Sequence, residues 1–185
     1  MRYSAKKLTI MAALTAAALI VFIIEAQIPL PIPVPGVKLG LANAITLFAL
    51  FYGSAGNPPN KPQRSMGRGG VGLSTADAFM ILVCRIILGA VFTGRIVAFL
   101  FSLSGGLLGF AAQAITKRFV TDKQIWVCGA VGAVFHNIGQ IMAAMLVTGS
   151  PAIAAYLPIL IIAGVATGIV TGLVAQITLS RMRVR

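Results

Sequence analysis

The sequence predicts an all-α integral membrane protein, a six-transmembrane-helix bundle with both termini in the cytoplasm. The chain is 58% hydrophobic and only 10% charged, whereas a soluble domain carries about 25% charged residues. Apolar stretches that are long enough to cross the roughly 30 Å hydrocarbon core recur along its 185 residues. We therefore expect a single transmembrane domain over residues 1–185, with no separate soluble domain.

The apolar stretches define the predicted helices. The six predicted spans are Leu8–Gln27, Leu39–Gly53, Ala76–Thr93, Ile96–Thr116, Ile125–Val147 and Leu157–Leu179. The second span is short, which indicates a helix that is covered partly by protein rather than by lipid. The first span follows a basic N-terminus, as a signal peptide would. It is longer than a signal peptide's apolar region and lacks a small-residue cleavage site, so we expect it to be retained.

Two connections between the spans differ in composition. The segment Ile28–Val37 has a proline at every second position up to Pro35, which excludes a helix and favours a stiff, extended outer loop. The segment Ser54–Thr75 is rich in Gly, Pro, Asn and basic residues and predicts a flexible cytoplasmic linker. Residues 67–72 fit the pattern GxGxxG, but the pattern indicates a nucleotide site only inside a βαβ unit. We therefore discard that interpretation.

The basic residues predict the orientation of the bundle. All but three of the 15 Lys and Arg residues lie before the first span, after the last, or in the connections that follow the second and fourth spans. The exceptions are Lys38 and Arg95 at the outer ends of spans and Arg85 within the third. Because cytoplasmic connections are enriched in Lys and Arg, the termini are expected in the cytoplasm. The net charge of +12 thus indicates membrane orientation and not nucleic-acid binding.

Small residues mark the places where helices approach closely, because helix association in lipid depends on backbone contact. Gly164, Gly168 and Gly172 recur at every fourth position of the last span, and internal packing of the bundle explains them. The first span carries a patch of alanines, Ala12, Ala13, Ala16 and Ala17. From these residues alone, the patch either packs within the bundle or docks on another membrane subunit.

Polar residues in or beside the spans are the candidate substrate-binding residues, because a buried polar group without a partner is costly. The candidates are Glu25, Gln27, Lys38, Asn43, Arg85, His136, Asn137 and Gln140. His136 and Gln140 share a helix face because they are four residues apart. Two interpretations stay open. The residues line a small-molecule pocket below the outer loop, or they only satisfy one another, for example with Glu25 paired to Lys38 or Arg85.

The sequence contains no recognisable catalytic or metal-binding set, and no cofactor is expected. Cys84 and Cys128 lie singly within apolar spans, without the spacing of a zinc site, and are interpreted as small core residues. The three acidic residues, Glu25, Asp77 and Asp122, lie far apart in the sequence.

Several short segments, spread over nearly the whole chain, form a recognisable pattern. They are Pro35–Asn43 with Ile45–Leu47, Arg85–Gly89, Ser102–Gly106, Gly132–Gln140 and Tyr156–Pro158. Together they resemble the family labelled heptaprenyl diphosphate synthase component I, also called the Gx transporter family. The most specific part is the string His-Asn-Ile-Gly-Gln at residues 136–140. The segment Ser54–Thr75 departs from the pattern and looks like an insertion.

The family is similar in size and helix plan to the substrate-binding S components of energy-coupling-factor (ECF) transporters. The resemblance implies an outer small-molecule site, a transmembrane coupling subunit on which small residues of the first helix dock, and separate ATPases that drive uptake. Ala12, Ala13, Ala16 and Ala17 match that docking pattern. The family label suggests a prenyl synthase instead. That chemistry requires several carboxylates holding Mg²⁺ ions, so we do not expect this chain to be catalytic.

The sequence thus predicts the membrane-embedded substrate-binding subunit of a small-molecule uptake transporter in the cell membrane. One alternative is a non-catalytic accessory subunit of heptaprenyl diphosphate or isoprenoid-quinone synthesis. A second alternative is a purely structural membrane scaffold. Pocket polarity distinguishes the transporter subunit from the scaffold, and the identity of the ligand does not follow from the sequence.

Overall fold

The computed structural model describes residues 4–28, 38, 40–52 and 72–183. Those residues form α-helices and one short 3-10 helix, and they contain no strand. The elements are α1 (Ala5–Glu25), α2 (Asn43–Tyr52), α3 (Thr75–Thr93), α4 (Ile96–Thr116), α5 (Ile125–Thr148), η1 (Pro151–Tyr156) and α6 (Leu157–Arg183). The all-α prediction is confirmed. Most of the predicted outer loop and linker, residues 29–37 and 53–71, lies outside the described residues.

Five helical segments are long and apolar enough to cross a membrane: α1, α3, α4, α5, and η1 with α6. This is the character of a multi-pass membrane protein. The exception among the α-helices is α2, whose 10 residues extend only about 15 Å. It begins at Asn43 and not at the predicted Leu39. Gly40 just before it has a φ of 79°, which lies outside the helical region.

The short helix α2 is covered by protein, as its length predicted. Most of its residues are buried, and it contacts every other α-helix of the described chain. At its C-terminal end, Lys117 Nζ donates to the carbonyl oxygen of Leu50 at 2.6 Å. Such a bond satisfies one of the carbonyls that a helix leaves without an intrahelical partner. The end of α2 is thereby tied to the end of α4.

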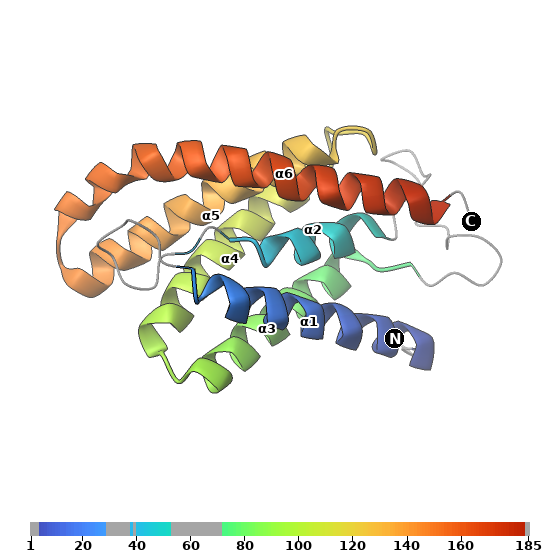
Figure 1. Ribbon diagram of the computed structural model, residues 1–185, viewed down its shortest axis with the longest axis horizontal. Coiled ribbons are helices and arrows are strands. Elements are labelled where there is room, and N and C mark those ends of the chain that lie inside the picture. Colours follow the sequence, from blue (N-terminus) through green and yellow to red (C-terminus); the bar gives the residue numbers. More distant parts are fainter. Residues whose placement is uncertain (1–3, 29–37, 39, 53–71, 184–185) are drawn as a thin grey trace.

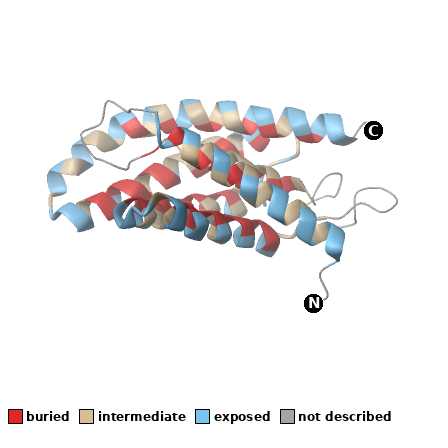
Figure 2. Cartoon of the chain, turned by 60° about the horizontal axis from the view of Figure 1, so that its bottom comes forward, coloured by how far each residue is buried: buried red, intermediate tan, exposed pale blue. Residues whose placement is uncertain are grey.

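The helices lie roughly along one long axis, and both chain ends are at the same end of the molecule (Figure 1). We call this the terminal end and the opposite one the distal end. Figure 2 shows buried residues along the inward-facing sides of the helices and exposed residues on the outside. The exposed outer residues are largely apolar, among them Val91, Ile162 and Val170, as expected of helices that face lipid.

Glycines bring α5 and α6 into backbone contact. A Cβ atom added at Gly168 would lie 2.6 Å from the carbonyl oxygen of Gly129 and 2.7 Å from Ala130 Cα. Gly172 faces Trp126 in the same way, with 2.5 Å from an added Cβ to Trp126 Cα. The predicted internal role of the glycine row in the last span is confirmed at these positions.

Asp77 links α1 to α3 at the terminal end. Ser74 and Asp77 form a capping box at the start of α3, and Lys7 Nζ lies 2.7 Å from Asp77 Oδ2. The Asp77 side chain is buried, so these partners compensate the cost of burying its charge. Asp77 therefore has a structural role, in which it joins α1 to the start of α3.

The two cysteines differ in environment. Cys128 is fully buried in the core with Leu47 and Ile81, as predicted. The prediction that Cys84 is a core residue is wrong, because its side chain is exposed. Arg85 follows it directly on α3 and is buried, and successive helical residues point about 100° apart. Because α3 is oriented with Arg85 towards the interior of the bundle, Cys84 lies on its outer side.

Candidate functional site

The predicted polar residues from four helices and one connection meet inside the bundle. We call this group the polar cluster, and its members are Glu25, Lys38, Asn43, Arg85, His136 and Gln140. Each is at least nine-tenths buried. Glu25 ends α1, Lys38 precedes α2, and Asn43 begins α2. Arg85 lies in the middle of α3, and His136 and Gln140 lie in the middle of α5.

His136 is the centre of the polar cluster. Its Nδ1 lies 2.9 Å from Asn43 Nδ2, and its Nε2 lies 2.5 Å from Gln140 Nε2. Asn43 Oδ1 in turn accepts from Arg85 Nη2 at 3.2 Å. Gln140 Oε1 accepts from the backbone N–H of Lys38 at 2.9 Å. One continuous chain of polar contacts therefore runs from α3 through α2 and α5 to the connection before α2.

Glycines leave the room that the His136 ring occupies. A Cβ added at Gly40 would lie 2.8 Å from His136 Cδ2, and one added at Gly105 would lie 2.9 Å from His136 Cε1. A Cβ at Gly109 would lie 3.1 Å from His136 Cβ. Larger residues at these positions would displace the ring, so the glycines of α4 and Gly40 fix where His136 sits.

Glu25 anchors the connection that enters α2. Its Oε1 accepts from the backbone N–H of Gly40 at 2.5 Å and from that of Leu41 at 3.2 Å. A carboxylate near the start of a helix also interacts favourably with the helix dipole. Glu25 attracts both Lys38 and Arg85 electrostatically, but neither cation lies within ion-pair distance of this carboxylate.

Phe22 joins the site although the sequence analysis did not single it out. Lys38 Nζ lies 3.3 Å from the centroid of the Phe22 ring, and Arg85 Cζ lies 5.8 Å from it. Gly89 of α3 provides the space, because a Cβ there would lie 2.9 Å from Phe22 Cε1. Phe22 shares a face of α1 with Glu25, three residues later. This three-residue spacing could have indicated that Phe22 lies near Glu25. Aromatic residues are common in apolar spans, however, so the spacing alone did not distinguish Phe22 from the others.

Lys38 carries its charge in a partly dehydrated environment. Burial lowers the pKa of Lys38 to about 8, against the opposing attraction of Glu25. The contact with the Phe22 ring is a cation–π interaction, which compensates part of the lost hydration. The fraction of Lys38 that is protonated therefore depends on the charged groups beside it.

Two of the predicted site residues lie outside the polar cluster. Asn137 is fully buried, but its Nδ2 donates to the carbonyl oxygen of Leu160 on α6 at 2.6 Å. It points away from His136 because adjacent helical residues differ by about 100°. Gln27 is exposed in the turn that follows α1. The structure therefore brings neither residue to the cluster.

The alanine patch on α1 is largely free of neighbours within this chain. Ala12, Ala13 and Ala16 are exposed and Ala17 is half-buried, whereas Ala18 is fully buried. The alternative in which the patch packs inside the bundle is therefore wrong for its three exposed members. Ala18 is the alanine that packs inward.

Replacing Gln140 by leucine (Gln140→Leu) should destabilise the protein. The change leaves the buried N–H of Lys38 without its acceptor, which costs about 1–3 kcal/mol. Thermal unfolding in detergent measures the loss, with Gln27→Leu as the matched control because Gln27 is exposed. Equal melting temperatures for the two variants would show that the bonds of Gln140 do not hold the connection in place.

Comparison with known proteins identifies the family. The sequence matches the family described as heptaprenyl diphosphate synthase component I over residues 14–56 and 71–178, which include every member of the polar cluster. No curated protein matches the chain, and no solved structure does. Since the match extends over most of the sequence and over all the described α-helices, this chain belongs to the heptaprenyl diphosphate synthase component I family.

Proposed function

We propose that this chain is the substrate-binding subunit of a small-molecule uptake transporter in the cell membrane, similar in plan to the S components of ECF transporters. The polar cluster is the observation that carries the proposal. Three ionisable side chains, Glu25, Lys38 and Arg85, are buried there together with His136. Ionisable residues inside a membrane bundle are costly and typically mark a ligand or ion pathway.

The position of the cluster also supports a binding role. Glu25 and Asn43 lie where α1 ends and α2 begins, so the cluster lies beside the ends of these two helices. Ligand sites in helical bundles are formed by side chains on facing helices. Under this proposal Arg85 and Lys38 contact the ligand, while Gln140 and Glu25 are positioning residues that hold the connection against α5 and α1.

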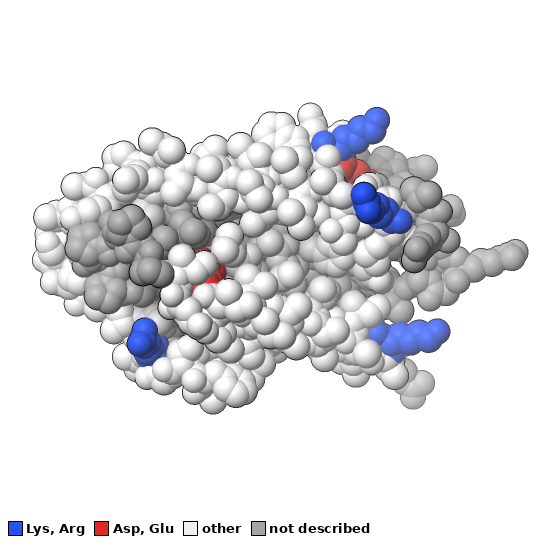
Figure 3. Space-filling view, viewed as in Figure 1, with Lys and Arg blue, Asp and Glu red and all other residues white. Residues whose placement is uncertain are grey.

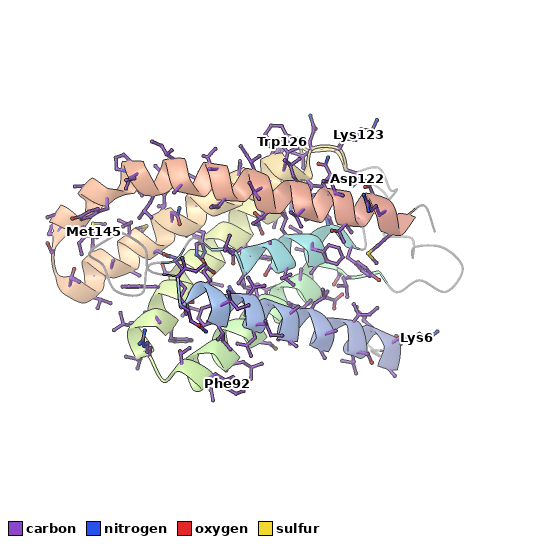
Figure 4. All side chains as sticks on the ribbon, viewed as in Figure 1. Lys6, Phe92, Asp122, Lys123, Trp126 and Met145 are labelled. Atoms are coloured by element: carbon purple, nitrogen blue, oxygen red, sulfur yellow. The ribbon has the colours of Figure 1, made fainter. Side chains whose placement is uncertain are left out.

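We propose further that the terminal end of the bundle is cytoplasmic. Lys6, Asp122 and Lys123 lie towards that end (Figure 4), and blue Lys and Arg side chains gather there, with one group at the opposite end (Figure 3). Because basic residues favour the cytoplasmic side, the polar cluster then faces the outside through the distal end.

This orientation is tested with two single cysteines in a background without Cys84 and Cys128. Arg95→Cys lies at the distal end, just before α4, and Lys123→Cys lies in the connection before α5. A membrane-impermeant maleimide should label the first variant on intact cells and the second only after lysis. The reverse pattern would place the cluster on the cytoplasmic side and contradict the proposal.

The exposed alanines on α1 fit the docking of a transmembrane coupling subunit, which would work with separate ATPases. Small residues let helix backbones approach closely in lipid, where apolar surface alone provides no drive for association. Ala12, Ala13 and Ala16 offer such a surface, and they are exposed in this chain. The partner's helix would then pack along the outer face of α1, away from the polar cluster.

Enlarging this surface should block docking without unfolding the subunit. Ala13→Leu is expected to lower co-purification of the coupling subunit at least about tenfold, because a larger side chain separates the backbones. Ala166→Leu is the matched control, since Ala166 is exposed on α6. Wild-type recovery of the coupling subunit with Ala13→Leu would contradict the docking surface, and failure of the wild type to bind one would contradict the transporter proposal.

The family's name supports a second candidate, a non-catalytic membrane subunit associated with heptaprenyl diphosphate synthesis. Glu25 binds backbone N–H groups, and Asp77 binds Lys7. A catalytic role is therefore not part of this proposal. The co-purification experiment separates the two functions, because a prenyl synthase would be recovered in place of a coupling subunit and ATPases.

A further inference from the structure

The polar cluster carries more positive than negative charge. Lys38 and Arg85 are cations, Glu25 is the one acidic member, and all three are buried. The carboxylate of Glu25 is engaged by the backbone N–H groups of Gly40 and Leu41, and it forms no ion pair with either cation. A buried charge without an ionic partner is strongly unfavourable. The cluster is therefore short of one negative charge.

The side chains around His136 share their hydrogen-bond acceptors closely. Both His136 ring nitrogens face amide nitrogens, Asn43 Nδ2 and Gln140 Nε2. A neutral imidazole accepts at only one nitrogen. Turning either amide group over does not help, because its oxygen is already used by Arg85 Nη2 or by the Lys38 N–H. One N–H along this chain of contacts therefore needs a further acceptor, and the backbone of Gly105 provides one beside His136.

Arg85 shows where an acceptor is missing. The residue is only 3% exposed, and its Nε is buried without a hydrogen-bond partner. The Phe22 ring attracts the positive charge of Arg85, but it offers no hydrogen-bond acceptor to the guanidinium N–H groups. Buried donors are nearly always satisfied in proteins, so an unsatisfied Nε at the centre of a polar cluster points to a missing acceptor.

We propose that the ligand of this site is an anion, bound through a carboxylate or phosphate group by Arg85, with Lys38 contributing the second positive charge. The inference rests on the proposed function and names its ligand class. A carboxylate or phosphate supplies both the acceptor missing at Arg85 Nε and the missing charge, and it matches the planar donors of arginine. A cationic ligand would meet two buried cations, and a neutral one would leave the charge uncompensated.

The ligand class is tested by fractionating an extract of cells that naturally make the protein. The deproteinised aqueous extract is separated on an anion exchanger into a flow-through and an anionic eluate, and the lipids are collected separately in organic solvent. Each fraction is added to the detergent-solubilised protein, and the melting temperature is measured. The anionic eluate should raise the melting temperature of the wild type, and the flow-through should not.

Variants then assign the effect to Arg85. Arg85→Gln should weaken binding of the anionic eluate at least about tenfold, while Arg85→Lys keeps the charge and should retain part of the affinity. Arg95→Gln is the matched control, because it removes an exposed arginine from the distal end. Glu25→Gln keeps an acceptor oxygen for the N–H groups of Gly40 and Leu41 and removes the negative charge that repels an anion, so it should bind the anionic eluate more tightly than the wild type.

Each outcome supports or overturns the inference. Two results would show that the ligand is not an anion: stabilisation by the flow-through alone, or loss of binding in Glu25→Gln but not in Arg85→Gln. Either result would still be consistent with a subunit that binds a small molecule. Stabilisation by the anionic lipid fraction alone would assign the anion to a lipid headgroup and overturn the uptake function. No stabilisation by any fraction would overturn both proposals. The melting temperature of each variant is also measured without any added fraction, so that a folding defect is distinguished from a loss of binding.

Discussion

Burying polar groups away from water is the constraint on which the rest of this structure depends. The bundle is apolar outside and closely packed inside, so each polar side chain that enters it must find a partner within the protein. Glu25 does so by holding the backbone at Gly40 and Leu41, and Gln140 does so by holding the backbone at Lys38. These bonds bring the connection before α2 down onto α1 and α5.

The same constraint separates the structural polar groups from the candidate functional ones. Asp77 has a lysine and a helix cap, and Asn137 has a carbonyl partner on α6; both bonds join neighbouring helices. Arg85 differs from Asn137, whose buried Oδ1 also lacks a partner, because it carries a charge: its buried Nε has no hydrogen-bond partner, and no carboxylate oxygen lies within ion-pair distance of it. A buried polar group whose hydrogen bonds are not all formed is expected at a functional site, where another molecule can form them.

The fold class and most of the polar cluster could be predicted from the sequence because they depend on local rules. The lengths of apolar stretches predicted the long helices, and the four-residue spacing of His136 and Gln140 predicted their shared face. Asn137 could not be excluded in the same way. Helix α5 packs against both α4 and α6, and periodicity does not tell which polar residue faces which neighbour.

Other features depended on tertiary contacts that no local pattern encodes. The late start of α2 follows from the positive φ of Gly40, and the His136 ring lies so close to Gly40 that no Cβ fits there. The role of Phe22 follows from Gly89 on a different helix, and the exposure of Cys84 follows from the rotation of α3 that buries Arg85. In each case the deciding partner is distant in sequence.

Native mass spectrometry of the purified protein tests the central claim, that the polar cluster binds a small molecule, most directly. The protein is released from mild detergent after incubation with an extract of cells that naturally make it. The wild type should carry one additional small-molecule mass at a one-to-one ratio, and the His136→Leu variant should not carry it. If the wild type shows only the mass of its own polypeptide, as the variant does, the account is contradicted.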